Sequence, residues 1–339
     1  MPQILILLCS FLPSAIARAD EGVRQADIVA ANKKLGRGIN LGNALEAPKE
    51  GAWGVTLKAE YFQVIREAGF DSVRLPVKWS AHAAGEAPYE MEVKFAERVD
   101  WAVDQALANK LNIVLDLHHF GEMDTDPDKH LPRLVALWEQ IAKRYADRPT
   151  SVYFELLNEP HDKLTAEKWN AAIPRVLAAV RKTNPTRPVI VGPANWNAIR
   201  ALDAFQLPDD GNLIVTVHFY DPFQFTHQGA SFVKDAAKWK GRKWTGTDAE
   251  QEAIRKSFAK AAEWAKQRKV PVFLGEFGTY QEADVESRAR WTRFVVAEAE
   301  RLGISWSYWE FCSGFGAYDP KAEAWRMPLK EALLAKASR

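Results

Sequence analysis

The chain contains, at residues 152–160, the run Val152-Tyr153-Phe154-Glu155-Leu156-Leu157-Asn158-Glu159-Pro160, which is apolar except for Glu155 until it ends in an asparagine and a glutamate. Such near-continuous apolar runs are typical of parallel β-strands that are covered on both faces. Seven similar runs recur along the 339 residues. Together they predict strands near Gly38–Leu41, Ser72–Val77, Asn112–Leu117, Val152–Leu157, Pro188–Val191, Leu213–His218, Val270–Leu274 and Ile304–Trp309.

Amphipathic stretches between these runs predict helices. We expect them at Leu57–Ala68, Val93–Asn109, Lys168–Lys182, Ala249–Arg268 and Asp284–Arg301. Strands that alternate with helices predict an α/β fold, and eight of them predict a single-domain (β/α)8 TIM barrel. The interval between the sixth and seventh strands is the longest and holds an insertion rich in aromatic residues and lysine, Tyr220–Gly246, which we expect on the active face.

The composition is that of an ordinary globular protein, with 47% hydrophobic and 26% charged residues. The formal net charge is only +1, so we expect neither nucleic acid nor a membrane surface as a partner. The two cysteines, Cys9 and Cys312, form no metal-ligand spacing with the histidines. We therefore expect no metal site. We also expect that the protein uses no cofactor and is a monomer.

The N-terminus resembles a signal peptide. An apolar run at residues 4–16 is followed by Ala17-Arg18-Ala19, a small-residue cleavage pattern, although the start carries no Lys or Arg. We expect residues 1–19 to be the signal and residues 20–339 to be the barrel, secreted to the periplasm or the exterior. The alternatives are a misassigned start or a cytoplasmic leader.

Active sites of (β/α)8 barrels lie at the carboxyl ends of the strands. Every predicted strand of this chain ends in or near a polar or aromatic side chain that could serve such a site. These side chains are Asn40, Asn43, Arg74, His118, His119, Asn158, Glu159, Trp196, Asn197, His218, Tyr220, Glu276, Trp309 and Glu310.

Two glutamates among them, Glu159 and Glu276, are candidates for a catalytic pair. Hydrolysis of a glycosidic bond needs one carboxyl to protonate the leaving oxygen and a second to act as nucleophile or base. The alternative for a lone strand-end glutamate is a buried ion pair. We interpret Glu155 in that way, as the structural partner of an arginine, and Asp116 as a residue that orients His118 or a neighbouring side chain.

The histidines also allow a metal hydrolase as an alternative. Because neighbours on a strand point to opposite faces, His118 and His119 are not expected to bind one ion together. For Arg74 two interpretations stay open: a core ion pair with Glu155 or Asp116, or a cation that lowers the pKa of the nucleophile. The acidic stretch at residues 121–130 is interpreted as a loop without a recognisable calcium-ligand spacing.

At these positions the chain resembles glycoside hydrolase family 5, and within it bacterial endo-β-1,4-glucanases. The motifs that carry the resemblance are Gly38-Ile39-Asn40-Leu41-Gly42-Asn43, Val73-Arg74-Leu75-Pro76, Leu115-Asp116-Leu117-His118-His119, Asn158-Glu159-Pro160, His218-Phe219-Tyr220, Gly275-Glu276-Phe277-Gly278 and Trp306-Ser307-Tyr308-Trp309-Glu310. The resemblance spans about residues 36–334.

The resemblance implies a retaining mechanism with Glu159 as acid/base and Glu276 as nucleophile. It implies that Arg74 and Tyr220 hydrogen-bond the nucleophile, and that four residues line the central sugar site: His118, Asn158, His218 and Trp309. More weakly, it implies further contacts to the sugar from Asn43, Glu46, His119, Trp196, His227 and Trp239.

The expected activity is that of a secreted retaining glycoside hydrolase that cleaves internal β-1,4-glucosidic bonds of soluble β-glucans by double displacement. The alternatives are an endo-β-1,4-mannanase or a dual glucanase/mannanase, and, outside catalysis, a carbohydrate-binding barrel. A retaining enzyme should hold its two carboxyl groups roughly 5–5.5 Å apart, and an inverting enzyme roughly 6.5–9.5 Å.

Overall fold

Eight parallel strands close into a barrel in chain order in the computed structural model of the protein, which describes residues 27–335. The predicted signal peptide, residues 1–19, lies outside the described residues. The strands are β1 (Arg37–Asn40), β2 (Ser72–Val77), β3 (Asn112–Leu117), β4 (Val152–Glu155), β5 (Val189–Val191), β6 (Leu213–Phe219), β7 (Val272–Phe277) and β8 (Ser305–Tyr308). All eight predicted strands and the barrel are thereby confirmed.

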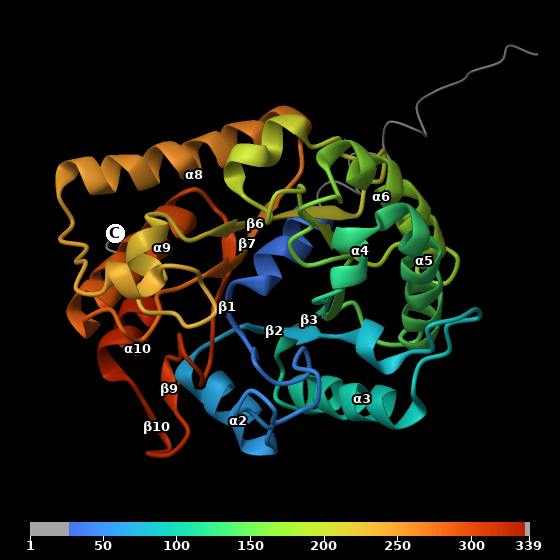
Figure 1. Cartoon of the computed structure of the whole chain (residues 1–339), viewed down its shortest axis with the longest axis horizontal. Helices are drawn as coiled ribbons and strands as arrows, with labels where there is room; N and C mark the ends of the chain where they lie inside the picture. Colours follow the sequence, from blue (N-terminus) through green and yellow to red (C-terminus); the bar gives the residue numbers. More distant parts are fainter. Residues whose placement is uncertain (1–26, 336–339) are drawn as a thin grey trace, which may run out of the picture.

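Helices surround the barrel (Figure 1). They are α2 (Ala59–Ala68), α3 (Val93–Ala108), α5 (Pro127–Arg144), α6 (Ala166–Arg181), α8 (Asp248–Arg268), α9 (Val285–Arg301) and α10 (Met327–Leu334). Short helices lie in the loops: α4 (Gly121–Thr125), α7 (Phe223–Thr226) and the 3-10 turns η1 (Trp79–His82), η2 (Ile199–Ala204) and η3 (Ala236–Trp239). A two-stranded antiparallel sheet, β9 (Tyr318–Asp319) and β10 (Ala324–Trp325), precedes α10.

The five predicted helices are confirmed to within about two residues at each end, but the sequence interpretation missed α5 and α10. The stretch at residues 121–130 is not a loop, because it forms α4 and the first turn of α5. The side chain of Asp126 caps α5 by accepting a hydrogen bond from the backbone of Lys129, and Pro127 occupies the first turn. The sequence interpretation took this stretch for a loop because acidic residues lie at the start of both helices.

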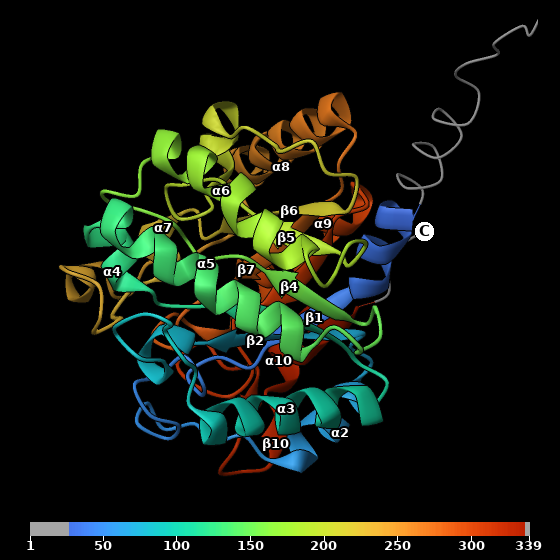
Figure 2. The same ribbon diagram turned by 90° about the vertical axis from the view of Figure 1, so that its right-hand side faces the viewer.

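The two ends of the barrel differ in chemistry. Residues 27–35 are helical and close the amino-terminal end of the strands, where Ile28 and Leu35 pack against inward-facing side chains such as Val114 and Phe273. Figure 2 shows this blue helix at one end of the barrel and the α4 and α7 loops at the other. The apolar amino-terminal end stabilises the barrel. The polar residues that could form an active site are therefore expected at the carboxyl ends of the strands.

A β-bulge between β6 and β7 sets the register near those carboxyl ends. Val217 pairs with Leu274, but the next residue, His218, pairs with Glu276, so Gly275 is left without a partner. A bulge re-aims the side chains that follow it. It brings His218 beside Glu276. None of the helices within residues 27–335 combines the length and the apolar character that a membrane span requires.

Candidate active site

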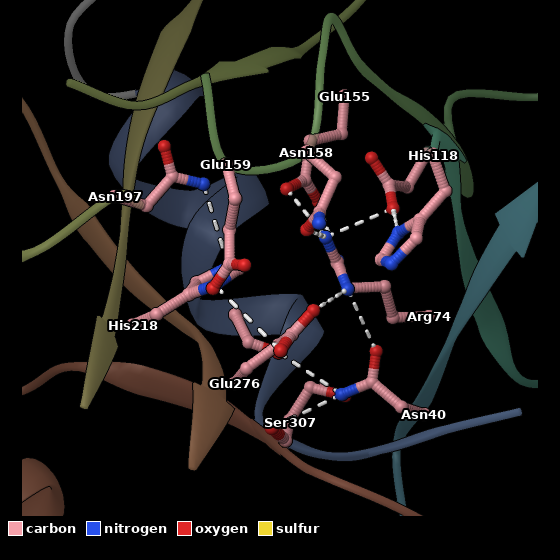
Figure 3. A network of polar contacts seen from close by, with 12 residues as sticks. Asn40, Arg74, His118, Glu155, Asn158, Glu159, Asn197, His218, Glu276 and Ser307 are labelled. Carbon is pink, nitrogen blue, oxygen red and sulfur yellow. Dashed lines mark hydrogen bonds and ion pairs between the residues drawn. The ribbon is translucent and has the colours of Figure 1, made fainter. Parts of the chain in front are cut away.

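Arg74, from β2, is the centre of a buried polar network inside the barrel mouth (Figure 3). Its guanidinium donates to or ion-pairs with three carboxylates and two asparagine side chains: Asp116, Glu155, Glu276, Asn40 and Asn158. The closest contacts to carboxylates are Nε to Glu155 Oε2 at 2.7 Å and Nη1 to Glu276 Oε1 at 2.8 Å. Arg74 therefore forms the predicted core ion pairs with Glu155 and Asp116, and it also contacts Glu276.

One guanidinium cannot balance three carboxylates, so the network holds excess negative charge away from water. Burial raises the pKa of Asp116 and of Glu276 to about 7, although Arg74 opposes both shifts. Burial also raises the pKa of Glu155. Arg74 lowers the pKa of Glu276, as the second interpretation predicted, but the loss of hydration on burial outweighs this effect.

Glu159 and Glu276 meet at the mouth of the barrel although 117 residues separate them. The side chain of Glu276, inside β7, is 6% exposed, whereas the side chain of Glu159, in the loop after β4, is 25% exposed. One oxygen of each carboxylate and a ring nitrogen of His218 all lie within 4.8 Å of one another. Burial raises the pKa of Glu159 to about 7, so two coupled carboxyls of similar proton affinity face each other.

Hydrogen-bond donors assign the proton within this pair. Glu276 accepts from Arg74 Nη1 at 2.8 Å and from the hydroxyl of Tyr220 at 2.8 Å. Donors of this kind stabilise a carboxylate. Burial beside Glu276 holds the pKa of Tyr220 well above its ordinary value, so the phenol keeps its hydrogen. The negative charge belongs on Glu276 and the proton on the more exposed Glu159.

His218, from β6, links the two glutamates. Its Nδ1 lies 2.7 Å from Glu159 Oε1 and 3.7 Å from Glu276 Oε2. Gly275 makes this approach possible, because a Cβ there would meet Thr216 Oγ1 at 2.5 Å and His218 Nε2 at 3.0 Å. The ring is buried, and burial lowers its pKa to about 4, so it is a neutral hydrogen-bonding group at neutral pH.

His118 and Trp309 form the opposite wall. Their rings are parallel, with centroids 5.8 Å apart, and His118 Nδ1 contacts the carboxylate of Asp116, as the sequence predicted. Trp309 follows β8 and packs over Gly42, where a Cβ would come within 2.9 Å of the indole ring. Glu310 is buried, and its carboxylate accepts backbone hydrogen bonds from the loop at residues 312–315. It holds this loop rather than facing a substrate.

The loop that follows β1 carries Asn43 and Glu46, which differ in their exposure to solvent. Asn43 is partly exposed, whereas Glu46 is 1% exposed. The carboxylate of Glu46 accepts hydrogen bonds from the backbone of Asn43 and of Ala44. Burial raises the pKa of Glu46 to about 8. The structure thus places Glu46 beneath the loop surface, where it supports Asn43 instead of reaching a sugar.

Aromatic side chains extend the site on both flanks. Trp196 is exposed and stacks on His161, with centroids 5.0 Å apart. On the other flank His227 is buried, stacks on Phe223 at 4.1 Å and meets the Tyr220 ring edge at 4.9 Å. Trp239, in η3, meets the edge of the same Phe223 ring.

His119 corrects one expectation. It follows the end of β3 with a φ of 53°, so strand alternation no longer applies. The rings of His118 and His119 therefore lie edge to face, 4.4 Å apart, and not on opposite faces. His119 also meets the exposed Trp53, a residue that the sequence interpretation missed. A lone tryptophan in a loop offers no periodic signal that would mark it.

Among the described residues, the carboxylate pair and His218 are the one group of three or more His, Cys, Asp or Glu side chains close enough to share a divalent ion. The donor set argues against a resident ion there. Both oxygens of Glu276 already accept hydrogen bonds, one of them from the cation Arg74. A metal at this position would compete with a guanidinium for the same charge.

Comparison with known proteins gives a consistent result. Residues 34–314 match the family model described as cellulase, glycosyl hydrolase family 5. The chain is 36% identical to Endoglucanase H of Acetivibrio thermocellus over 278 residues, which is 82% of this chain and 30% of the relative. It is 27% identical to Endoglucanase 3 of Fibrobacter succinogenes, over 85% of this chain and 51% of the relative. The chain thus spans about a third to a half of these relatives.

The solved structures include a close relative that covers the whole barrel. Thermotoga maritima Cel5A is 48% identical and superposes with a TM-score of 0.90 over 91% of this chain and 100% of that one. Its structures are described in complex with cellobiose and with mannotriose.

Proposed function

Because the chain belongs to the cellulase family, glycosyl hydrolase family 5, we propose that it is an endo-β-1,4-glucanase that works with retention of anomeric configuration. The observation that carries the proposal is the approach of Glu159 and Glu276, with an oxygen of each within 4.8 Å of the other. This separation fits the short spacing of retaining enzymes and leaves little room for the water molecule that an inverting enzyme must place between its carboxyls.

The proposed reaction has two steps. In the first, Glu276 attacks the anomeric carbon, the glycosidic C–O bond breaks, and Glu159 gives its proton to the leaving oxygen. In the second, Glu159 takes a proton from water, the water oxygen bonds to the anomeric carbon, and the ester bond to Glu276 breaks. Charge moves between two groups that Arg74 and His218 already hold in place, so little rearrangement is needed.

The substrate class follows from the relatives and from the aromatic flanks of the site. We propose soluble β-1,4-glucans, because the curated relatives are endoglucanases and one solved relative is described with cellobiose. β-1,4-Mannan is the second candidate, since the same relative is also described with mannotriose. Exposed aromatic rings such as Trp53 and Trp196 suit the apolar faces of either sugar.

Release of reducing ends from a panel of soluble polysaccharides tests the activity and its substrate in one experiment. The panel holds carboxymethylcellulose, mixed-linkage glucan, glucomannan and galactomannan. We expect the highest rates on the glucans. Higher rates on galactomannan would overturn the substrate assignment, and no release from any polymer by a folded protein would overturn the enzyme assignment.

Two controls separate the alternatives to this mechanism. Glu276→Gln should bind cello-oligosaccharide in calorimetry but not cleave it, whereas a binding-only barrel would give a wild-type protein that behaves in the same way. Exhaustive chelation should leave the wild-type rate unchanged. A rate that falls on chelation and returns with a divalent ion would favour a metal hydrolase.

The predicted signal peptide leads to a separate proposal, secretion to the periplasm or the medium. It is supported only by the apolar run at residues 4–16 and the small residues that follow. Expression of the full chain in a bacterial host, followed by mass spectrometry of the exported protein, tests it. We expect a mature N-terminus after Ala17 or Ala19, and an uncleaved cytoplasmic product would refute it.

A further inference from the structure

Three consecutive residues after β5 adopt the left-handed conformation. Asn195, Trp196 and Asn197 have φ values of 68°, 58° and 50°. This conformation costs roughly 1–2 kcal/mol for each residue with a side chain, although asparagine tolerates it best. Hydrogen bonds hold the turn: the backbone N–H groups of Asn195 and Trp196 both donate to the carbonyl of Pro160, at 2.7 and 3.2 Å. A turn of this cost is expected where its side chains have a task.

The side chain of Asn197 points from this turn to His218. It is 0% exposed, and its Nδ2 lies 3.4 Å from His218 Nε2 (Figure 3). The backbones are joined as well, because the N–H of His218 donates to the carbonyl of Asn197 at 2.9 Å. The amide oxygen lies over Gly192, where a Cβ would come within 2.5 Å of it. The amide group is therefore enclosed next to the imidazole.

The nitrogen of the amide faces His218, while its buried oxygen has no hydrogen-bond partner among the described residues. An amide nitrogen can only donate, so in this orientation Nε2 of His218 presents its lone pair to Asn197. A neutral imidazole then carries its single hydrogen on Nδ1. Nδ1 lies 2.7 Å from Glu159 Oε1 and 3.7 Å from Glu276 Oε2, so this hydrogen faces two acceptors. The other oxygen of Glu159, Oε2, forms no hydrogen bond within the part of the chain that the structure describes.

We propose that Asn197 is a positioning residue that fixes the tautomer of His218 and thereby keeps the acidic proton of Glu159 on Oε2. This inference rests on the proposed role of Glu159 as acid/base. With the opposite tautomer, Nδ1 would accept a hydrogen bond, and the carboxyl proton would turn to Oε1 and away from the leaving oxygen. Asn197 touches neither substrate nor Glu159; it acts through the imidazole.

Nitrogen-15 NMR of the histidine side chains tests the tautomer in the wild-type protein. The chain has seven histidines, and the His218 signals are assigned from their loss in His218→Gln. We expect Nδ1 to carry the hydrogen and Nε2 to resonate as an unprotonated nitrogen at pH 6–7. A hydrogen on Nε2 would overturn the proposal without any engineered change at Asn197.

Kinetics of Asn197→Asp test the consequence. A carboxylate at this position accepts and so demands a hydrogen on Nε2. We expect kcat/KM for cellotetraose to fall by about 10²-fold or more, the range of a general-acid contribution. The leaving group of 2,4-dinitrophenyl β-cellobioside needs no proton. For this substrate we expect the rate constant for formation of the glycosyl-enzyme to fall less than about 10-fold, because only the acid is impaired.

Asn195→Asp is the matched control, since it puts the same charge into the same turn on an exposed side chain. We expect wild-type kinetics from it. An equal loss on both substrates in a folded Asn197→Asp would show a merely structural role, and unchanged rates on both would also refute the proposal. If Asn197→Asp does not fold, the wild-type spectrum decides. Failure of the proposed function would appear differently, as a wild-type protein inactive on both substrates.

Discussion

Gly275→Ala is the substitution that most sharply tests how the barrel places its catalytic groups. Gly275 is the unpaired residue of the β6–β7 bulge and lies against Thr216 and His218. Its φ is not in the left-handed region, so the added methyl group acts by its volume alone.

The magnitude follows from the distances. The new Cβ would lie 2.5 Å from Thr216 Oγ1 and 3.0 Å from His218 Nε2, whereas ordinary contact begins at 3.4 Å. Thr216 must therefore retreat by about 0.9 Å and the imidazole by about 0.4 Å. Overpacking of a filled core costs about 1–3 kcal/mol of unfolding free energy. A displacement of His218 by this amount should lower kcat roughly 10-fold, since about 1 Å of misplacement can cost 10²-fold.

The assays are urea unfolding and steady-state kinetics on carboxymethylcellulose. Gly85→Ala is the control, because a Cβ there meets nothing within 4 Å. Thr216→Ala in the Gly275→Ala background removes the closer clash, so it should restore stability more than activity. If Gly275→Ala matched Gly85→Ala in both stability and kcat, the reasoning about the bulge would be refuted.

Three further predictions concern the buried charges. Because burial raises the pKa of Glu159 to about 7, kcat/KM should fall as the pH rises above about 7 and the acid loses its proton. In Glu159→Gln, assayed with 2,4-dinitrophenyl β-cellobioside, this fall at alkaline pH should vanish, and its persistence would assign it to another group. Arg74→Lys should lose about 3–5 kcal/mol of stability at pH 7 in urea unfolding, because the lysine cannot reach all the carboxylates. The raised pKa values of Asp116 and Glu276 mean that these groups gain protons below pH 7, so the penalty should shrink toward pH 5; a constant penalty would argue against the charge network. Glu46→Gln should change stability by less than about 1 kcal/mol near pH 4, where Glu46 is uncharged in the folded and the unfolded protein. Because burial raises the folded pKa of Glu46 to about 8, wild-type stability should fall as the pH rises from about 4.5 to 8, so the variant should be the more stable protein at pH 7; a variant with the same slope as the wild type would refute the assignment.

The sequence predicted the barrel well because its physical signal is local. A parallel strand buried on both faces is expected to be mostly apolar, and the eight runs satisfied that condition independently of one another. The carboxyl ends of such strands share one rim, so the meeting of Glu159 with Glu276 followed from topology alone. The ion pair between Glu155 and Arg74 was also predictable, since a buried charge needs a partner.

What the sequence did not predict depends on contacts between distant segments. The bulge at Gly275 exists only because β6 and β7 pair, and nothing in either strand alone reveals the shift. His119 appeared to continue a strand but turns left-handed just beyond it. The charge around Glu276 depends on how many buried carboxylates share Arg74. That number is known only from the assembled structure.

Loop residues were the weakest predictions for the same reason. Glu46 had the appearance of a sugar ligand, but its carboxylate accepts hydrogen bonds from its own loop. Trp53 carried no periodic signal and nevertheless lies exposed beside His119. A polar or aromatic loop residue can face the ligand or support the loop, and only the backbone path decides between the two.

The most direct test of the account is the configuration of the first product, followed by proton NMR during rapid cleavage of cellopentaose. Attack by Glu276 and then by water inverts the anomeric carbon twice, so the β-anomer should appear first and mutarotate slowly to the α-anomer. An initial α-anomer would mean a single displacement by water, and the close pairing of Glu159 with Glu276 would then need another explanation.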